Sequence, residues 1–186
     1  MPELVERYWT AEDVRALPED GNRHECVDGV LLVTPAPSFN HGYAVEFLRD
    51  RLRNYVRTNE LGQLFSAPAD LEIVPGSIVQ PDLFVAQSAS GARIRMAQDI
   101  AEVVLTVEVL SPSTAKVDRE GKRRFYQRAG VGEYWIVDLD ARVIERWTPA
   151  AERAEILSAA MVWRPRGASE ALEFDIASYC EQALDD

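Results

Sequence analysis

Asp82 and Glu108 are acidic residues that border or interrupt apolar stretches of the chain. Asp82 follows Pro81 and precedes the apolar residues 83–85, and Glu108 lies within the apolar run 103–110. Such a run is typical of a strand that is buried on both faces. A carboxylate there costs free energy unless it is paired, hydrogen-bonded or bound to a metal. Both residues are candidate metal ligands, although Asp82 can also cap a turn and Glu108 can also pair with an arginine.

Lysine is used sparingly in this chain, and both lysines come shortly after Glu108. Lys116 and Lys122 are the two lysines among 20 basic residues, so the other 18 are arginines. A lysine provides a compact ammonium whose pKa responds to its surroundings, which suits a catalytic position. Chance placement of so few residues is the alternative.

The segment after Glu108 indicates how a lysine reaches that carboxylate. The turn 111–114 contains a proline and ends the strand, and residues 115–129 are predicted to form a helix. Asp118, Lys122 and Tyr126 are spaced i, i+4 and i+8, so they share one helix face. That face is predicted to pack over the end of the strand. A solvated position for Lys122 and a packing role for Tyr126 remain the alternatives.

Two carboxylates and a backbone carbonyl are suitable ligands for Mg²⁺, with Mn²⁺ as a possible substitute. We expect Asp82, Glu108 and the carbonyl of Val109 to be these ligands. Such a cation lowers the pKa of bound water and stabilises charge on a phosphoryl oxygen. Lys122 would orient the water, help to deprotonate it, or offset developing negative charge. The pattern therefore predicts metal-assisted hydrolysis of phosphodiesters.

Several short motifs resemble, in their order, the Uma-type family of proposed restriction endonucleases within the PD-(D/E)XK nuclease superfamily. They cover nearly the whole chain and are Glu25-Cys26-Val27-Asp28-Gly29, His41, Pro81-Asp82, Glu108-Val109-Leu110-Ser111-Pro112-Ser113-Thr114, Asp118, Lys122, Tyr126 and Gly130-Val131-Gly132-Glu133-Tyr134-Trp135-Ile136-Val137-Asp138.

The resemblance implies a restriction-endonuclease-like fold in which Asp82 and Glu108 are metal ligands. The chain departs from the superfamily pattern because no lysine stands two residues after Glu108. In the Uma-type family the lysine is taken to lie on the following helix, which here means Lys122, with Lys116 as the weaker candidate. This agrees with the helical spacing.

Further residues are candidates for supporting roles at this site. Asp118 and Tyr126 share the helix face of the lysine. Glu25 either reaches the metal through water or faces solvent, and His41 either joins the site or is structural. Three arginines form either a strip that contacts nucleic-acid phosphates or a solvated face, namely Arg119, Arg123 and Arg124.

The pattern of elements predicts an α/β fold, with one mixed β-sheet flanked by helices. We expect residues 1–186 to be a single domain, with 1–20 as an N-terminal helical extension. A hairpin is predicted at 23–34 around the Asp28-Gly29 turn. A long helix is predicted to follow, capped by Ser38 or Asn40 and ending near residue 58. Strands are expected within 63–85, at 101–110, 133–138, 142–148 and 161–163, before a terminal helix from 175.

The formal net charge of −11 argues against tight, nonspecific binding to nucleic acid, because such binding depends on neutralising phosphates. It leaves room for a local basic groove or for a cation that supplies the positive charge. Cys26 and Cys180 fit no metal spacing, and the N-terminus lacks a signal-peptide pattern. We therefore expect a cytoplasmic protein without membrane segments, acting on DNA as a homodimer.

Two other functions fit the same residues. A binding or regulatory module would keep the nuclease fold without catalysis, since fold alone does not establish function. A metal-dependent hydrolase of a small phosphodiester would agree better with the strong negative charge.

Overall fold

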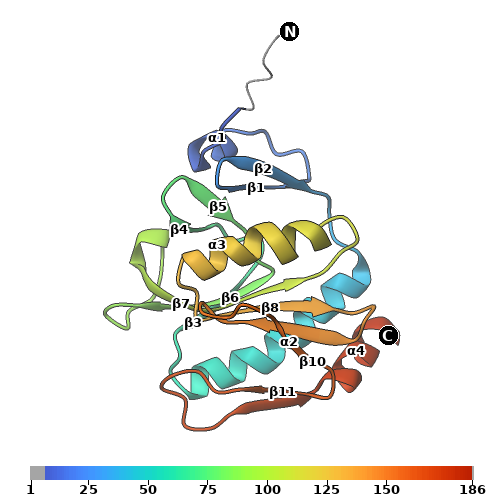
Figure 1. Cartoon of the computed structure of the whole chain (residues 1–186). Coiled ribbons are helices and arrows are strands. Elements are labelled where there is room, and N and C mark those ends of the chain that lie inside the picture. The colour runs from blue at the N-terminus through green and yellow to red at the C-terminus, as the bar shows by residue number, and fades with distance from the viewer. Residues whose placement is uncertain (1–6, 186) are drawn as a thin grey trace.

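The chain forms an α/β fold around a six-stranded mixed sheet, as a computed structural model that describes residues 7–185 shows (Figure 1). The strand order in this sheet is β10-β9-β8-β7-β6-β3. Its strands are β3 (Gln63–Ser66), β6 (Leu83–Ser88), β7 (Ile100–Val109), β8 (Glu133–Asp138), β9 (Val143–Trp147) and β10 (Glu155–Leu157).

A four-stranded sheet of order β2-β1-β5-β4 and a two-stranded sheet of β11 and β12 complete the strands. Their bounds are β1 (Arg23–Val27), β2 (Val30–Thr34), β4 (Leu71–Val74), β5 (Ser77–Val79), β11 (Ala160–Trp163) and β12 (Leu172–Asp175). The α-helices are α1 (Ala11–Arg15), α2 (Phe39–Thr58), α3 (Arg123–Arg128) and α4 (Ile176–Asp185), with a 3₁₀ turn at Ala97–Asp99.

Strand β7 organises the centre of the molecule. It pairs antiparallel with β6, where Leu83 faces Val107, and parallel with β8, where Glu108 faces Ile136. Because parallel neighbours need a crossover, the chain forms a helix between β7 and β8. Asp82 directly precedes β6, so the register brings it beside the end of β7 that carries Glu108.

Helices cover both faces of the central sheet, with α3 on one side and α2 on the other in Figure 1. The apolar side of α2 packs with β6, β7, β8 and α4 in one core cluster, which includes Leu48, Leu52 and Trp135. A second cluster joins α3 to the four-stranded sheet and includes Phe125 and Tyr126. The helix after β7 is therefore fixed between two sheets.

The predicted helix after β7 is present but contains a π-helical segment at Val117–Lys122, directly before α3. The backbone N–H of Arg123 donates to the carbonyl of Asp118, five residues earlier. A π segment widens the helix locally and is frequent at functional sites. Asp118 and Lys122 nevertheless share the buried face of this segment, as their spacing predicted.

Most predicted elements are confirmed, and the differences concern short segments and the grouping of the strands, because the described strands form three sheets and not the one expected. The hairpin β1-β2 pairs as expected, and Ser38 is the cap of α2, since its side chain accepts from the His41 backbone N–H. Strands β10 and β12 were not predicted. Part of the expected N-terminal extension, residues 1–6, lies outside the described residues, and α1 is the α-helix found within 7–20. No helix within residues 7–185 is long and apolar enough to cross a membrane.

Candidate active site

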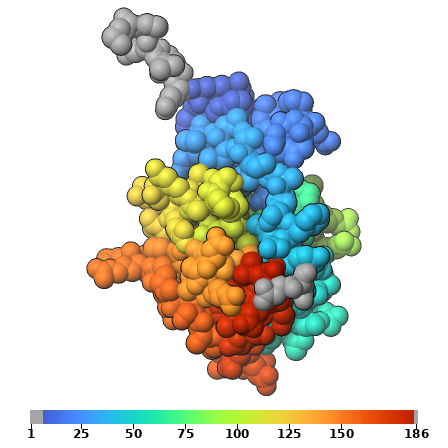
Figure 2. Space-filling model, turned by 90° about the vertical axis from the view of Figure 1, so that its right-hand side faces the viewer, coloured from blue at the N-terminus to red at the C-terminus, as the bar shows by residue number. Residues whose placement is uncertain are grey.

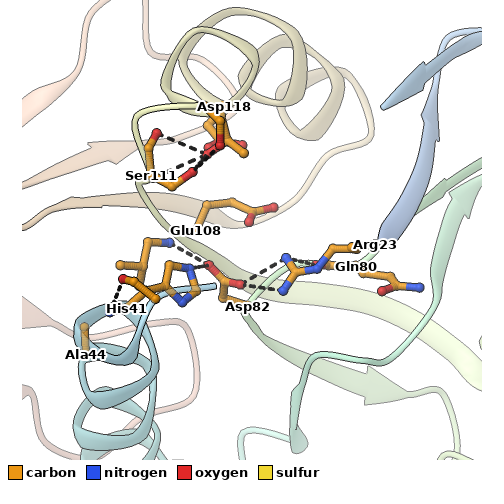
Figure 3. A network of polar contacts seen from close by, with 12 residues as sticks. Arg23, His41, Ala44, Gln80, Asp82, Glu108, Ser111 and Asp118 are labelled. Atoms are coloured by element: carbon orange, nitrogen blue, oxygen red, sulfur yellow. Dashed lines mark hydrogen bonds and ion pairs between the residues drawn. The ribbon is translucent and has the colours of Figure 1, made fainter. Parts of the chain in front are cut away.

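Asp82 is held by four donors at the junction of β6 and β7 (Figure 3). Two guanidinium nitrogens of Arg23 donate to its Oδ1 at 3.0 and 3.1 Å. The other oxygen, Oδ2, accepts from His41 Nε2 at 3.0 Å and from the Val109 backbone N–H at 2.8 Å. Burial alone would raise the pKa of Asp82, but His41, Arg23 and Val109 outweigh it and hold the pKa below its ordinary value. Asp82 is therefore an ionised carboxylate.

Lys122 lies in a cluster of buried carboxylates next to Asp82. Its Nζ is 2.9 Å from Glu108 Oε1, 2.8 Å from Glu25 Oε2 and 3.8 Å from Asp118 Oδ1. The Lys122 side chain is 4% exposed. Glu25 is fixed in turn because its Oε1 accepts from the Gln80 backbone N–H at 2.7 Å. The long-range fold thus brings a hairpin residue, a strand residue and one other helix residue around the ammonium of Lys122.

The charge of Lys122 follows from this cluster. Burial disfavours the ammonium, but the carboxylates of Glu108, Glu25 and Asp118 outweigh burial and raise its pKa above the ordinary value. Lys122 is therefore a protonated cation at neutral pH. A group in this state donates hydrogen bonds and supplies positive charge, but it accepts no proton.

Glu108 has an excess of negative charge around it. Burial, together with Asp118, Asp82 and Glu25, raises its pKa well above the ordinary value even though Lys122 opposes the shift. The Tyr126 hydroxyl also donates to Glu108 Oε1, at 3.3 Å. Burial raises the pKa of Tyr126 as well, so this hydroxyl stays a donor.

These side chains line one small cavity of about 130 Å³. Its wall includes Arg23, His41, Asp82, Glu108 and Lys122. Its rim is formed by two loops, residues 34–38 before α2 and residues 111–114 after β7. Figure 2 shows this side of the molecule, where the light-blue segment leading into α2 lies beside the yellow segment leading into α3.

The chain matches a family model over most of its length. Residues 11–177 match the model of Uma2, which carries the description "Putative restriction endonuclease". The chain belongs to the Uma2 family. This confirms the resemblance that the order of the motifs indicated.

One solved structure supports the fold of this Uma2 protein. It is the crystal structure of a protein titled "putative nuclease" from Anabaena variabilis ATCC 29413, with a TM-score of 0.73 and 21% sequence identity. The match covers 94% of this chain and 99% of the other. At this identity the likeness concerns the fold alone. No curated protein matches the chain.

The sequence predicts a metal at this site, and the donor chemistry of the cavity fits a hard cation. Four buried carboxylates face the two permanent cations Arg23 and Lys122, and the carboxylates are Glu25, Asp82, Glu108 and Asp118. Asp118 Oδ1 is buried without a hydrogen-bond partner. Of the two carboxylate oxygens of Glu108, only Oε1 accepts hydrogen bonds from residues 7–185. A divalent cation would balance this surplus.

The cluster is not a preformed cage, however. Within the described part of the chain, no three His, Cys, Asp or Glu side chains are arranged to hold a cation. The predicted set of Asp82, Glu108 and a carbonyl has only two such side chains. The third predicted ligand, Val109, contacts Asp82 through its backbone N–H. Any role of its carbonyl stays a prediction.

The predicted arginine strip is mostly engaged within the protein. Arg119 pairs with Asp138 at 2.7 Å and with Glu145 at 2.6 Å. Arg123 donates to Gln127 at 2.8 Å and lies over a tryptophan ring. Arg124 is exposed and pairs with no residue that the structure describes. Nucleic-acid contact by these residues stays a prediction, and Arg124 has the greatest freedom to make it.

Arg23 is the residue of the cavity that sequence reasoning missed. A signal was present, because Arg23 and Glu25 are two residues apart on the predicted strand and therefore point to the same face. Once Glu25 is a candidate, that alternation makes Arg23 a candidate as well. Its partner Asp82 is 59 residues away, and that pairing comes only from the tertiary fold.

Proposed function

We propose that this Uma2 protein is a metal-dependent endonuclease that hydrolyses phosphodiester bonds in DNA. The observation that carries the proposal is the junction of Asp82, Glu108 and Lys122 in one cavity, in a chain of a family described as restriction endonucleases. Asp82 and Glu108 would hold Mg²⁺, or Mn²⁺ in its place. When bound, the cation would acidify a water molecule and stabilise charge on the phosphoryl oxygens.

The chain's own residues have separable roles in this reaction. Glu25 and Asp118 position the Lys122 ammonium, and Glu108 receives one of its hydrogen bonds. Because Lys122 is protonated, it orients the attacking water and offsets developing negative charge rather than acting as the base. The Tyr126 hydroxyl donates to the same Glu108 oxygen as Lys122, and at 3.3 Å against 2.9 Å it is the longer contact of the two.

Substrate discrimination is the direct test of this proposal. Wild type would be incubated with supercoiled plasmid, single-stranded DNA, RNA and a small aryl phosphodiester, each with Mg²⁺, with Mn²⁺ and with a chelator. The proposal predicts cleavage of DNA that requires the cation. Cleavage of the small diester alone would establish the alternative hydrolase, which the net charge of −11 favours. No cleavage of any substrate would favour the noncatalytic module.

The proposed reaction also bears on assembly. Cutting both strands of a duplex is easiest with two sites related by a two-fold axis, so we propose a homodimer. Trp135 is buried on β8, between β7 and β9, so its side chain is not available to a dimer interface. Sedimentation with and without duplex DNA would test the dimer.

A further inference from the structure

The carboxylate of Asp82 has no free position for another ligand. A carboxylate offers about four lone-pair sites. Arg23 takes both sites of Oδ1, and His41 with the Val109 backbone N–H takes those of Oδ2. A cation can therefore bind Asp82 only after one of these donors has left.

Of these donors, Arg23 would free the largest part of the Asp82 carboxylate by moving away. It is the one described residue that bonds Oδ1, so its movement frees that whole oxygen. By contrast, departure of His41 leaves Oδ2 bonded to the main chain of Val109, which is fixed in the central sheet. The Arg23 side chain is also the more exposed of the two, at 19% against 12% for His41, and it lines the cavity.

Arg23 also has donors to spare for an incoming anion. Of the five guanidinium N–H groups, three donate to Asp82 and to the Gln80 carbonyl. The remaining two have no partner within the described residues. Guanidinium groups bind phosphate oxygens through two parallel hydrogen bonds, which an ammonium cannot reproduce.

We propose that Arg23 occupies Asp82 in place of a cation in the free protein and moves to a phosphate oxygen when a phosphodiester enters the cavity. Metal and phosphodiester then bind cooperatively, because each removes what opposes the other. The phosphodiester draws the guanidinium from Asp82, and its negative charge offsets the repulsion between that guanidinium and the cation. This inference rests on the proposed metal-dependent function and assigns Arg23 a positioning and phosphate-binding role.

Manganese binding without turnover tests the inference. Free Mn²⁺ would be measured by electron paramagnetic resonance during titration of wild type, Arg23→Met and Asp82→Asn, each with and without dimethyl phosphate. In wild type, we expect dimethyl phosphate to tighten Mn²⁺ binding by roughly tenfold, a usual size for coupling between sites. In Arg23→Met, we expect Mn²⁺ alone to bind about tenfold more tightly than in wild type, with the effect of dimethyl phosphate lost.

Arg146→Met is the matched control. Arg146 also pairs with one carboxylate, Glu155, and donates to one backbone carbonyl, that of Val162. Its side chain is 21% exposed, close to the value for Arg23, but it lies on β9 outside the cavity. This variant is expected to bind Mn²⁺ as wild type does. If Arg23→Met fails to fold, Arg23→Gln replaces it, because glutamine keeps an amide donor for the Gln80 carbonyl.

The outcomes separate the inference from the proposed function. Mn²⁺ binding that disappears in Asp82→Asn but is the same in Arg23→Met and wild type, with equal response to dimethyl phosphate, would overturn the role of Arg23 alone. Absence of Mn²⁺ binding in wild type and Arg23→Met, with and without dimethyl phosphate, would overturn the metal site and the inference together.

Discussion

Replacement of Lys122 by methionine is expected to destabilise the protein in a strongly pH-dependent way. The substitution keeps an unbranched side chain of similar length and removes the ammonium that Glu108 and Glu25 contact at 2.9 and 2.8 Å. Removal of one partner from a buried ion pair generally costs about 3–5 kcal/mol, because the other charge stays buried.

The size of the loss in stability follows from the cost of protonating a carboxylate. The variant can replace the lost ammonium with one additional proton on a carboxylate of the cluster. Binding that proton costs about 1.4 kcal/mol for each pH unit above an ordinary glutamate pKa of about 4.3. The expected loss in the free energy of unfolding is therefore about 3–4 kcal/mol at about pH 7 and about 1 kcal/mol at about pH 5.

The sign follows from proton linkage. The pKa of Glu108 is already raised in the folded protein, and loss of Lys122 removes the group that opposes this shift. The folded variant then binds one more proton than the unfolded chain over this interval, so its stability rises as the pH falls. In wild type Lys122 opposes the rise in the pKa of Glu108, so the difference in pH dependence between the two proteins isolates the lysine.

Urea unfolding followed by circular dichroism at both pH values measures this difference. Lys116→Met is the matched control, because Lys116 is exposed, lies at the start of the same π-helical segment and forms no ion pair within residues 7–185. Its stability should change by less than about 0.5 kcal/mol. If Lys122→Met loses no more free energy of unfolding than this control, or loses the same amount at both pH values, the buried ion-pair cluster around Lys122 would be refuted.

Two further substitutions test contacts next to the buried cluster. Tyr126→Phe removes the hydroxyl that donates to Glu108 and should lower stability by about 0.5–1.5 kcal/mol. It should weaken Mn²⁺ binding only slightly, and a complete loss in a titration would show that the hydroxyl matters more than this contact indicates. Arg119→Met removes ion pairs to Asp138 and Glu145 and should cost about 1 kcal/mol at low salt. Thermal unfolding should show a smaller loss at high salt, and a loss independent of salt would contradict an electrostatic origin.

The sequence was sufficient for those parts of the site that depend on local periodicity. The apolar run around Glu108 identified the buried strand, and helical spacing placed Asp118 and Lys122 on one face. The π-helical segment was not predictable from this spacing, because it depends on how the helix fits between two sheets. The expected face was nevertheless correct, since the i, i+4 relation survives within the segment.

Contacts between distant segments were beyond the sequence. Nothing local to Asp82 indicates that Arg23 and His41 fill its lone pairs, because these residues are 59 and 41 positions away. The short strands β10 and β12 were missed for another reason. Strand β10 has three residues and a largely exposed burial pattern, so its hydrophobic alternation is weak. Strand β12 does alternate apolar and polar residues, but over only four positions, and this signal was overlooked.

Mg²⁺-dependent cleavage of supercoiled plasmid by wild type, Glu108→Gln and Glu102→Gln tests most directly whether this cavity is an active site. Glu102 is an exposed glutamate on the same strand, β7, so its variant controls for the substitution itself. Wild type and Glu102→Gln are expected to cut the plasmid, whereas Glu108→Gln, shown to be folded by circular dichroism, is expected not to cut it. Undiminished cleavage by Glu108→Gln would contradict the assignment of this cavity as the active site.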